Sequence, residues 1–404
     1  MQYLFTERAH LMCPHMCFGI AAAVSRPYDE ARIRDTIDRL GATHPFLNAL
    51  LGYEAGKNAY YYDITDRLQA KLRLNDREIG GIDDPEVMEE FRQLTGKEWD
   101  LAEEGMLKVC AWPMGNRTCF LLVFHHLLAD GRGALGLAQE LADCYVSGTA
   151  PKPVQEQLIA SAKDLPGNSR LPFVSRMLVQ KANRDFTKEQ RTVSYEEYRA
   201  FADGFLKADH VAHTVTRTGP EEMNGIAEQC RNHGVTVNDW LLARMMMEEN
   251  TGKVIMACDL RDRLGVYREG ALGNYSTAFS IEMKAKGKEL FPLAKEIHDS
   301  VRRKIERPAE LLLVLQCYAD LNPGVLDAAM ISCKGGFPSK TGKFIGSMFF
   351  GFGKGDGHSV TNLGRIESQS MPEAFFIPPA SPAIRKTWGV LTVNGTMTVC
   401  TSER

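Results

Sequence analysis

The sequence FHHLLADG, residues 124–131, holds two adjacent histidines followed by an aspartate and a glycine. The residues that lead into it, TCFLLVF at 118–124, are apolar and predict a buried strand. Successive side chains on a strand point to opposite faces, so His125 and His126 cannot both enter one cleft. We expect one imidazole to pack or hydrogen-bond locally. The other projects into a site, where it can take a proton from a hydroxyl, amine or thiol.

Asp130 and Gly131 stand at the turn into a predicted helix, GALGLAQELADCYVSG at 133–148. At this turn Asp130 can cap the free N–H groups of the helix, or pair with a cation and hold the loop in shape. Gly131 allows a tight turn or the close approach of another part of the backbone.

By residue type alone, the histidine pair is also compatible with a metal site or with simple packing. A metal would need a third ligand on the same face, and the neighbouring sequence does not supply one. Cys13, His15 and Cys17 would share one face of a strand predicted at 13–25, but this triplet lacks a fourth ligand. Packing is the better interpretation of the triplet, and we expect no metal site.

Composition indicates an ordinary globular protein. The chain has 404 residues, 48 Lys plus Arg against 51 Asp plus Glu, a net charge of −3, and 44% hydrophobic and 25% charged residues. These values exclude disorder, a collagen-like structure and a highly basic nucleic-acid-binding protein, and the length favours two or three domains.

The cysteines and the hydropathy pattern predict a cytoplasmic protein. Ten cysteines are spread along the chain without a CxxC pair, which favours free thiols in a reducing compartment. No apolar run approaches the roughly 18 residues that a membrane span needs. The apolar stretch at 17–24 lacks the preceding positive charges of a signal peptide.

Along the chain, the pattern predicts two halves that each mix helices with antiparallel strands. The first has a helix capped by Asp29 and a hairpin turning at Gly115-Asn116; the pattern loosens at 151–209, with short helices at most. The second has helices at 220–234 and 237–250 and further strands, ending in a hairpin that turns at Asn394-Gly395. The strands expected in the second half lie at 211–218, 254–260, 346–353, 358–364, 374–379 and 386–401. This pattern favours α+β sandwiches of similar size.

The pattern His125-His126-x-x-x-Asp130-Gly131 resembles the HHxxxDG signature of the CoA-dependent acyltransferase superfamily. That superfamily includes chloramphenicol acetyltransferase, condensation domains, and alcohol and polyketide-associated acyltransferases. Further stretches resemble its motifs in the same order along the chain: THPFLNALL (43–51), VTVNDWLLA (235–243), CDLRDRL (258–264), LGNYST (272–277) and SVTNLGRIE (359–367).

The resemblance implies an α+β fold of two chloramphenicol-acetyltransferase-like sandwich halves arranged in a V, with a tunnel between them. The corresponding division is an N-terminal half at 1–170, a crossover linker at 171–208 and a C-terminal half at 209–404. Coenzyme A or a carrier-protein phosphopantetheine arm brings an acyl thioester into the tunnel as co-substrate, with no permanently bound cofactor. A small alcohol or amine is the acceptor, and neither nucleic acid nor a membrane is an expected partner.

The resemblance also assigns roles to residues. His126 becomes the general base, with His125 as its support and Gly131 completing the signature. Asp130 becomes a structural residue, held by an arginine from the second half for which Arg261 is the candidate. Asn274 and Ser276 are candidate donors to an oxyanion. The expected activity is a thioester-dependent O- or N-acyltransferase. The alternative is a catalytically idle, condensation-like scaffold that binds a carrier protein or a pathway partner.

Overall fold

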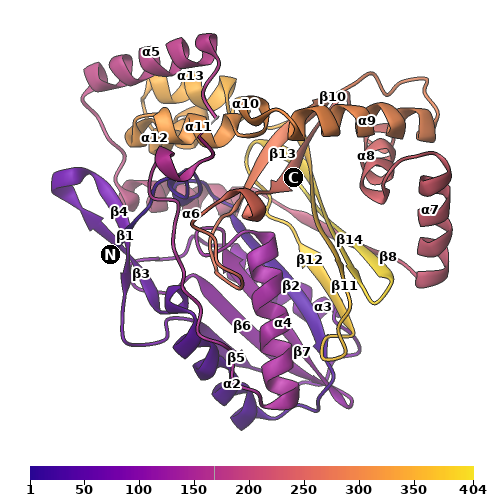
Figure 1. The fold of residues 1–404 in the computed structure, drawn as a ribbon. Helices are drawn as coiled ribbons and strands as arrows, with labels where there is room; N and C mark the ends of the chain where they lie inside the picture. The colour runs from indigo at the N-terminus through magenta and orange to yellow at the C-terminus, as the bar shows by residue number, and fades with distance from the viewer. Residues whose placement is uncertain (168) are drawn as a thin grey trace.

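Two large sheets, each built mainly from one half of the chain, form the frame of the structure (Figure 1). The structure is a computed structural model that describes residues 1–167 and 169–404. Asn168, in the predicted N-terminal half, lies outside the described residues. Among the described residues, every helix is too short or too polar to cross a lipid bilayer.

The N-terminal sheet has five strands in the order β12-β2-β7-β6-β5. Its strands are antiparallel except for the parallel pair β5 and β6. The strands are β2 (Cys17–Val24), β5 (Lys71–Leu74), β6 (Leu107–Met114), β7 (Arg117–His125) and β12 (Glu373–Ile377). The hairpin predicted at Gly115-Asn116 is confirmed, since β6 and β7 pair directly across that turn.

The C-terminal sheet has six strands in the order β10-β9-β11-β13-β14-β8. Strand β11 runs parallel to both of its neighbours, and the other pairs are antiparallel. The strands are β8 (Ala212–Thr218), β9 (Lys253–Asp259), β10 (Ser276–Glu282), β11 (Gly357–Ile366), β13 (Ile384–Val393) and β14 (Thr396–Glu403). The predicted hairpin at Asn394-Gly395 joins β13 to β14 and is confirmed.

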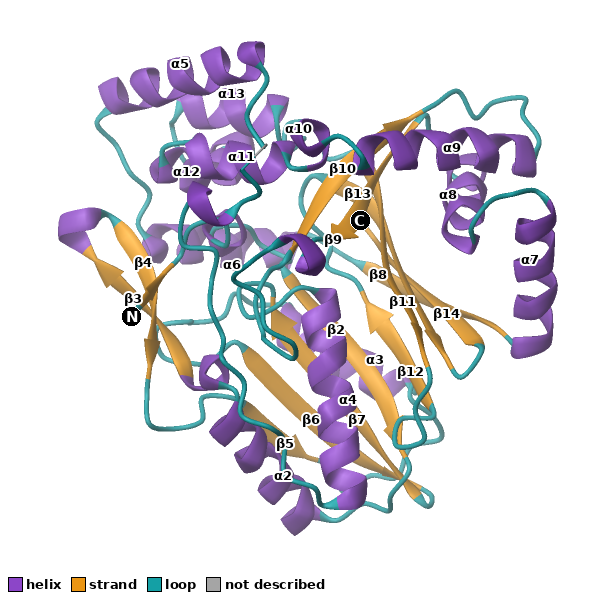
Figure 2. Ribbon diagram, in the orientation of Figure 1, coloured by secondary structure: helices purple, strands orange, loops and turns teal. Residues whose placement is uncertain are grey.

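Helices cover both sheets (Figure 2). On the N-terminal sheet, α2 and α4 pack together and α4 contacts β2, while α3 contacts β2 and β7. On the C-terminal sheet, α8 and α9 pack together beside β9 and β10, and α7 contacts α8 and β14. These helices are α2 (Glu30–Thr43), α3 (Pro85–Thr95), α4 (Gly131–Ser147), α7 (Pro220–Asn232), α8 (Val237–Glu248) and α9 (Leu290–Ile305). The predicted cap of α2 is confirmed, because the Asp29 carboxylate accepts from the backbone N–H of Arg32.

A helical layer and a small sheet complete the molecule. The layer contains α1 (Arg8–Leu11), α5 (Phe173–Glu189), α6 (Tyr195–Ala208), α10 (Pro308–Leu311), α11 (Leu313–Asp320), α12 (Pro323–Cys333) and α13 (Lys340–Met348). The small sheet has the order β1-β4-β3 and consists of β1 (Gln2–Tyr3), β3 (Ala49–Glu54) and β4 (Ala59–Ile64). Single 3-10 turns lie at Pro45–Asn48, Ala55–Lys57, Ala162–Asp164 and Arg261–Arg263.

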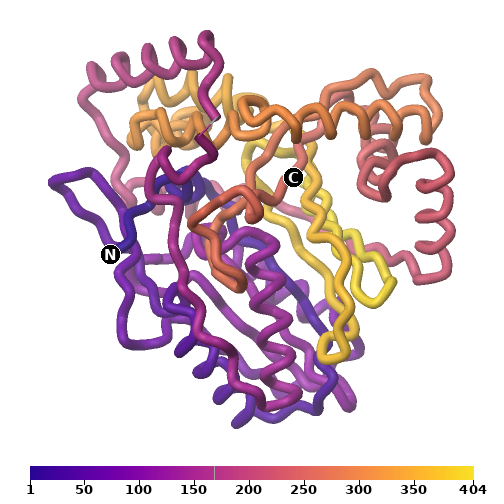
Figure 3. The backbone as a smooth tube through the Cα atoms, in the orientation of Figure 1, coloured from indigo at the N-terminus to yellow at the C-terminus, as the bar shows by residue number. Residues whose placement is uncertain are grey.

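One strand crosses between the halves. The backbone tube in Figure 3 places the late segment beside the early strands, and β12 pairs antiparallel with β2. The sheet of the N-terminal half is therefore completed by residues 373–377, which the sequence assigned to the C-terminal half. The two halves share backbone hydrogen bonds, which fixes the seam between them.

The segment predicted as a strand at 346–353 is different in the structure. Helix α13 runs to Met348, and turns follow it. Gly342 and Gly346 allow α13 to pack closely on α12; a Cβ at Gly346 would lie 2.3 Å from the carbonyl oxygen of Ala329. Short apolar runs fit a strand and a buried helix equally well. Here the close packing of α13 on α12 favours the helix.

The predicted linker at 171–208 is mostly helical. The sequence suggested short helices at most, but α5 and α6 have 17 and 14 residues. Each buries only three side chains: Val179, Ala182 and Phe186 in α5, and Tyr198, Ala202 and Leu206 in α6. A weak apolar stripe of this kind gives little periodic signal, so tertiary packing rather than local pattern stabilises these helices.

Candidate active site

The two adjacent histidines diverge at the end of β7. His125 is its last residue and is 2% exposed, whereas His126 lies in the following turn and is half-buried. The backbone N–H of His126 donates to the carbonyl of Met16, which holds this turn against the start of β2. One imidazole thus faces the interior and the other faces a cavity, the arrangement that strand alternation predicts.

His125 is held in the core. Its Nδ1 accepts from the backbone N–H of Leu127 at 3.3 Å, which places the ring proton on Nε2. That nitrogen lies 4.0 Å from the carboxyl of Glu98. Burial lowers the pKa of His125 to about 3 and raises the pKa of Glu98 to about 8, so both groups are neutral near pH 7.

Asn274 sets the orientation of His126. Its side-chain N–H groups donate to the backbone carbonyls of His126 (2.8 Å) and Leu127 (3.2 Å), which identifies Oδ1 as the remaining acceptor. Nδ1 of His126 donates to that oxygen at 2.9 Å. The ring proton is therefore on Nδ1, and Nε2 keeps its lone pair.

This geometry changes the expected role of Asn274. The sequence predicted Asn274 as a candidate oxyanion donor, but backbone carbonyls use both of its N–H bonds. Asn274 instead orients the imidazole of His126 through the bond to Nδ1. Ser276, the other candidate, begins β10, is half-buried and lines the same cavity as His126.

A third histidine, His10, stacks on His126, and the sequence pattern did not predict it as a site residue. The rings of His10 and His126 have centroids 4.4 Å apart and planes at 14°. His10 comes from the short helix α1, and Phe18 packs edge-on against His126 at 5.3 Å. Burial holds the pKa of His10 well below its usual range, and the neighbouring imidazoles add to this. No local pattern around His10 signals this contact, because it joins the chain terminus to the end of β7.

Asp130 makes both kinds of contact that the sequence left open. It caps α4, with Oδ1 accepting from the backbone N–H of Gly133 at 2.9 Å. It also forms a two-bond ion pair with Arg261, at 2.8 and 3.1 Å. Its Oδ2 accepts a further bond from the backbone N–H of Tyr275 at 2.9 Å. Arg261 and Tyr275 belong to the C-terminal half, so Asp130 ties the two halves together beside the site.

The charges of this pair are stabilised in place. Burial acts to raise the pKa of Asp130, but the Arg261 guanidinium and the backbone donors outweigh it and hold the pKa below the usual value. The pKa of Arg261 is correspondingly raised.

Gly131 sits where β11 approaches α4. A Cβ at this position would lie 2.5 Å from a methyl carbon of Leu363, so only glycine fits without movement of that side chain. The neighbour that approaches Gly131 is therefore a side chain of the C-terminal sheet, and not the second stretch of backbone that the sequence suggested.

A cavity of about 220 Å³ lies between the halves at His126. The N-terminal half contributes Thr6, His10 and His126 to its wall, and β9, β10, α11 and β11 contribute most of the rest. Burial lowers the pKa of His126, although Asp130 and the Asn274 hydrogen bond act in the opposite direction. His126 is accordingly neutral at pH 7, the form that can accept a proton.

A buried ionic network supports the loop that carries Asn274. Glu156 accepts from Nδ1 of His44 at 2.8 Å and from the backbone N–H groups of Phe46 and Leu272 at 2.7 and 3.2 Å. Nε2 of His44 lies 2.6 Å from Glu140. Burial alone would lower the pKa of His44, but the two carboxylates raise it to about 9. Glu156 thus links the charged His44, at the end of α2, to Leu272 in the loop at 272–277.

The Cys13, His15 and Cys17 triplet does not share a strand face. Strand β2 begins only at Cys17, and His15 has a φ of 60°, in the left-handed region. His15 instead contacts Asp209 at 2.8 Å. Among the described residues there is no group of three or more His, Cys, Asp or Glu side chains placed to hold a metal ion.

The two sheet-based halves with this cavity at their seam form a condensation-domain fold. No protein-family model and no curated protein matches the sequence. The likeness comes from solved structures that are 11–14% identical to this chain, which establishes the fold alone.

Three such structures show the extent of the similarity. The condensation domain from Monacolin K polyketide synthase MokA has a TM-score of 0.59 and 11% identity, with 100% of this chain and 92% of that chain covered. Polyketide synthase associated protein 5 from Mycobacterium tuberculosis has a TM-score of 0.58 and 14% identity, with 100% and 92% covered. The epimerization domain from the third module of tyrocidine synthetase B has a TM-score of 0.58 and 13% identity, with 99% and 87% covered.

Proposed function

We propose that this protein is a thioester-dependent acyltransferase with His126 as its general base. It moves an acyl group from coenzyme A or a carrier-protein phosphopantetheine arm to a hydroxyl or amine of a small acceptor. One observation carries the proposal: the bond from His126 to Asn274 keeps the ring proton on Nδ1 and leaves Nε2 free at a cavity that both halves line.

The proposed reaction has two proton transfers. The acceptor oxygen or nitrogen attacks the thioester carbonyl while Nε2 of His126 removes the acceptor proton. A tetrahedral intermediate forms, with negative charge on the former carbonyl oxygen. The C–S bond then breaks, the oxyanion returns to a carbonyl, and His126 gives its proton to the departing thiol. No acyl-enzyme is required, because both substrates meet in one cavity and their proximity lowers the barrier.

Ser276 is the proposed donor to the oxyanion. It lines the cavity with His126, and its neighbour Asn274 is committed to the histidine. Loss of one such donor lowers kcat by about 10²–10³-fold in enzymes that use them. Ser276→Ala should therefore reduce turnover strongly. Because the substitution leaves the rest of the site in place, the reduction can be assigned to the lost hydroxyl.

His10 is proposed as a positioning residue. Its stack on one face of His126 and the edge of Phe18 restrict the rotation of the imidazole. Together with Asn274, these contacts fix the direction in which Nε2 points. The base is thereby held ready before the acceptor arrives.

The test is a thiol-release assay with acetyl and longer acyl-CoA donors against a panel of alcohols and amines. We expect His126→Ala to lower kcat by about 10²–10⁴-fold, the usual contribution of a general base. His233→Ala, at an exposed histidine that follows α7, is the matched control and should keep full activity. Full activity of His126→Ala, or no thiol release with any donor and acceptor, would show that the chain is not this enzyme. The second result would favour the idle scaffold.

A further inference from the structure

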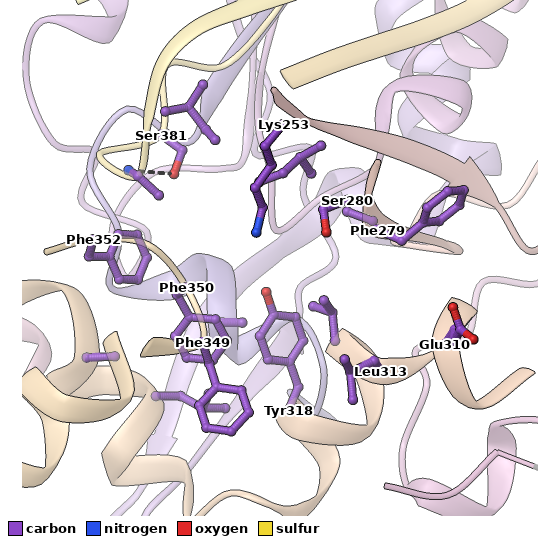
Figure 4. A pocket seen from close by; sticks show the side chains of 18 of the residues that line it. Lys253, Phe279, Ser280, Glu310, Leu313, Tyr318, Phe349, Phe350, Phe352 and Ser381 are labelled. Carbon is purple, nitrogen blue, oxygen red and sulfur yellow. Dashed lines mark hydrogen bonds between the residues drawn. The ribbon is translucent and has the colours of Figure 1, made fainter. Parts of the chain in front are cut away.

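A second pocket, of about 410 Å³, adjoins the cavity at His126. The two share five lining residues, Ile255, Ala278, Val314, Tyr318 and Ile384. Figure 4 shows this pocket, with aromatic rings around one side and Lys253 reaching toward it from β9. The shared wall means that a substrate at His126 can extend a group into this pocket without leaving the seam.

The pocket is lined mainly by apolar side chains. The rings of Phe349, Phe350 and Phe352 lie on one side, and Leu313 of α11 lies on another (Figure 4). Val314, the next residue of α11, also lines the pocket. The hydroxyls on its wall belong to Ser280, Tyr318 and Ser381. A volume of a few hundred Å³ with this lining is typical of sites that bind a mostly apolar ligand.

The charged residues that line the pocket are Lys253, Lys304 and Glu310, and each pairs with an opposite charge. Lys253 pairs with Glu282 at 2.7 Å, and both side chains are largely exposed. Lys304 pairs with Glu310 at 3.4 Å. Each lysine of the lining therefore has a carboxylate partner, although Glu310 also pairs with Arg307 at 2.9 Å. These carboxylates weaken the attraction of the two lysines for a phosphate group, and the mainly apolar lining favours an uncharged group.

We propose that this pocket binds a hydrocarbon chain of the reacting substrate. The inference rests on the proposed acyl transfer at His126, and it specifies the substrate class as a medium-chain acyl thioester or a medium-chain alcohol or amine. Both sources present the same chemistry to the wall, namely a run of methylene groups.

The length of β10 between the cavity at His126 and this pocket sets the length of the hydrocarbon chain. Ser276 lines the cavity at His126, and Ser280, four residues along β10, lines the pocket. Four residues of an antiparallel strand span about 14 Å. An extended hydrocarbon advances about 1.3 Å per carbon, given C–C bonds of about 1.5 Å at tetrahedral angles. The wall therefore accommodates a chain of about ten carbons.

The experiment is a chain-length series with two arms. One arm varies the donor from acetyl-CoA to hexadecanoyl-CoA with one short alcohol. The other varies a linear alcohol over the same lengths with acetyl-CoA. We expect kcat/KM to rise two- to fourfold per methylene in one arm, because each buried methylene contributes about 0.8 kcal/mol, and to level off near ten carbons. The arm that rises identifies the substrate that carries the chain.

Two variants and a control test the location. Leu313→Trp fills the pocket and should abolish the gain with chain length while turnover of acetyl donors is kept. Phe350→Ala enlarges the pocket and should move the plateau to longer chains. Phe344→Ala, on α13 and 48% exposed outside this pocket, is the matched control and should behave as the native protein.

A binding measurement separates this inference from the proposed function. Decanol and decanoyl-pantetheine are added to the native protein and to the Leu313→Trp variant, and the melting temperature is recorded. Stabilisation of the native protein alone supports the pocket even if no transfer is found. Two results would overturn the pocket assignment and leave the acyl transfer in place. One is turnover of short donors with no dependence on chain length in either arm. The other is equal stabilisation of the native protein and the Leu313→Trp variant.

Discussion

The ring of His10 lies parallel to the ring of His126, with centroids 4.4 Å apart. An aromatic stack of this kind contributes about 0.5–1.5 kcal/mol beyond the area that it buries. We therefore expect His10→Ala to lower kcat by about 2- to 12-fold through loss of the stack. His10→Phe keeps a flat ring and should retain activity within about twofold of the native protein.

The pH profile of the same variants checks that His10 acts through His126. In His10→Ala, water replaces the stacked ring, so the acid limb of the kcat/KM profile should move to higher pH. His10→Phe should leave the limb in place. If His10→Phe is as slow as His10→Ala, the nitrogens of His10 rather than its flat ring are what the reaction needs.

Asn274 controls the tautomer of His126. Asn274→Leu is similar in size but makes none of the three hydrogen bonds that the amide provides. Loss of a buried partner costs about 1–3 kcal/mol, so kcat should fall about 5- to 150-fold. Steady-state kinetics with the best donor measures this. An unchanged kcat would mean that the tautomer is set by another group.

The lowered pKa of His126 predicts the pH dependence of the proposed reaction. In the proposed reaction the neutral ring of His126 is the active form, and burial moves its pKa below the ordinary 6.5. The kcat/KM should therefore be constant at neutral pH and fall as the pH drops through a value below 6.5. A pH–rate profile measured between pH 4 and 9 tests this. A midpoint above 6.5 would contradict the assignment of the base.

The Asp130–Arg261 pair should matter for folding as well as for rate. Asp130 is 3% exposed, and its carboxylate accepts four hydrogen bonds from partners in both halves. Removing one member of a buried pair costs about 3–5 kcal/mol, because the other charge is left unpaired. We expect Asp130→Ala to lower the free energy of unfolding by about this amount in urea denaturation.

Arg261→Ala and the double variant complete a thermodynamic cycle for this pair. The double variant should lose less stability than the two single changes added together, since no lone charge is left behind. Low turnover of Asp130→Ala with native melting behaviour would contradict the structural role.

The buried His44 should make stability depend on alkaline pH. Its pKa is raised from 6.5 to about 9 by Glu140 and Glu156, so its contribution is complete below pH 6.5 and is lost as the pH rises through 9. The free energy of unfolding should fall by on the order of 3 kcal/mol across this range, at about 1.4 kcal/mol per pH unit. Glu140→Gln removes one of the two carboxylates, so its stability should change less with pH. Equal slopes for both proteins would exclude this network as the cause.

Local sequence was enough for some of the site. Alternation along TCFLLVFHH predicted that the two histidines separate, and His125 is 2% exposed while His126 lines a cavity. Asp130 could be placed as a helix cap because caps depend on a few neighbouring residues. The same holds for the turns at Gly115-Asn116 and Asn394-Gly395.

Other features followed only from the resemblance to HHxxxDG proteins. Composition and spacing do not connect Asp130 with Arg261, 131 positions later. The motif order suggested this contact, and the structure brings the two side chains within 2.8 Å. The roles of His126 and Ser276 in a reaction, and of Arg261 in stability, stay predictions until the variants above are measured.

The sequence by itself determined the local geometry: which residues alternate along β7, where helices are capped and where hairpins turn. Only the tertiary structure decided that Asn274 orients His126 and that His10 stacks on the imidazole of His126. It also decided that residues 373–377 add an edge strand to the N-terminal sheet. The physical reason is range. Caps, turns and alternation arise from neighbours a few residues apart, whereas these contacts join distant segments and depend on how every intervening element packs.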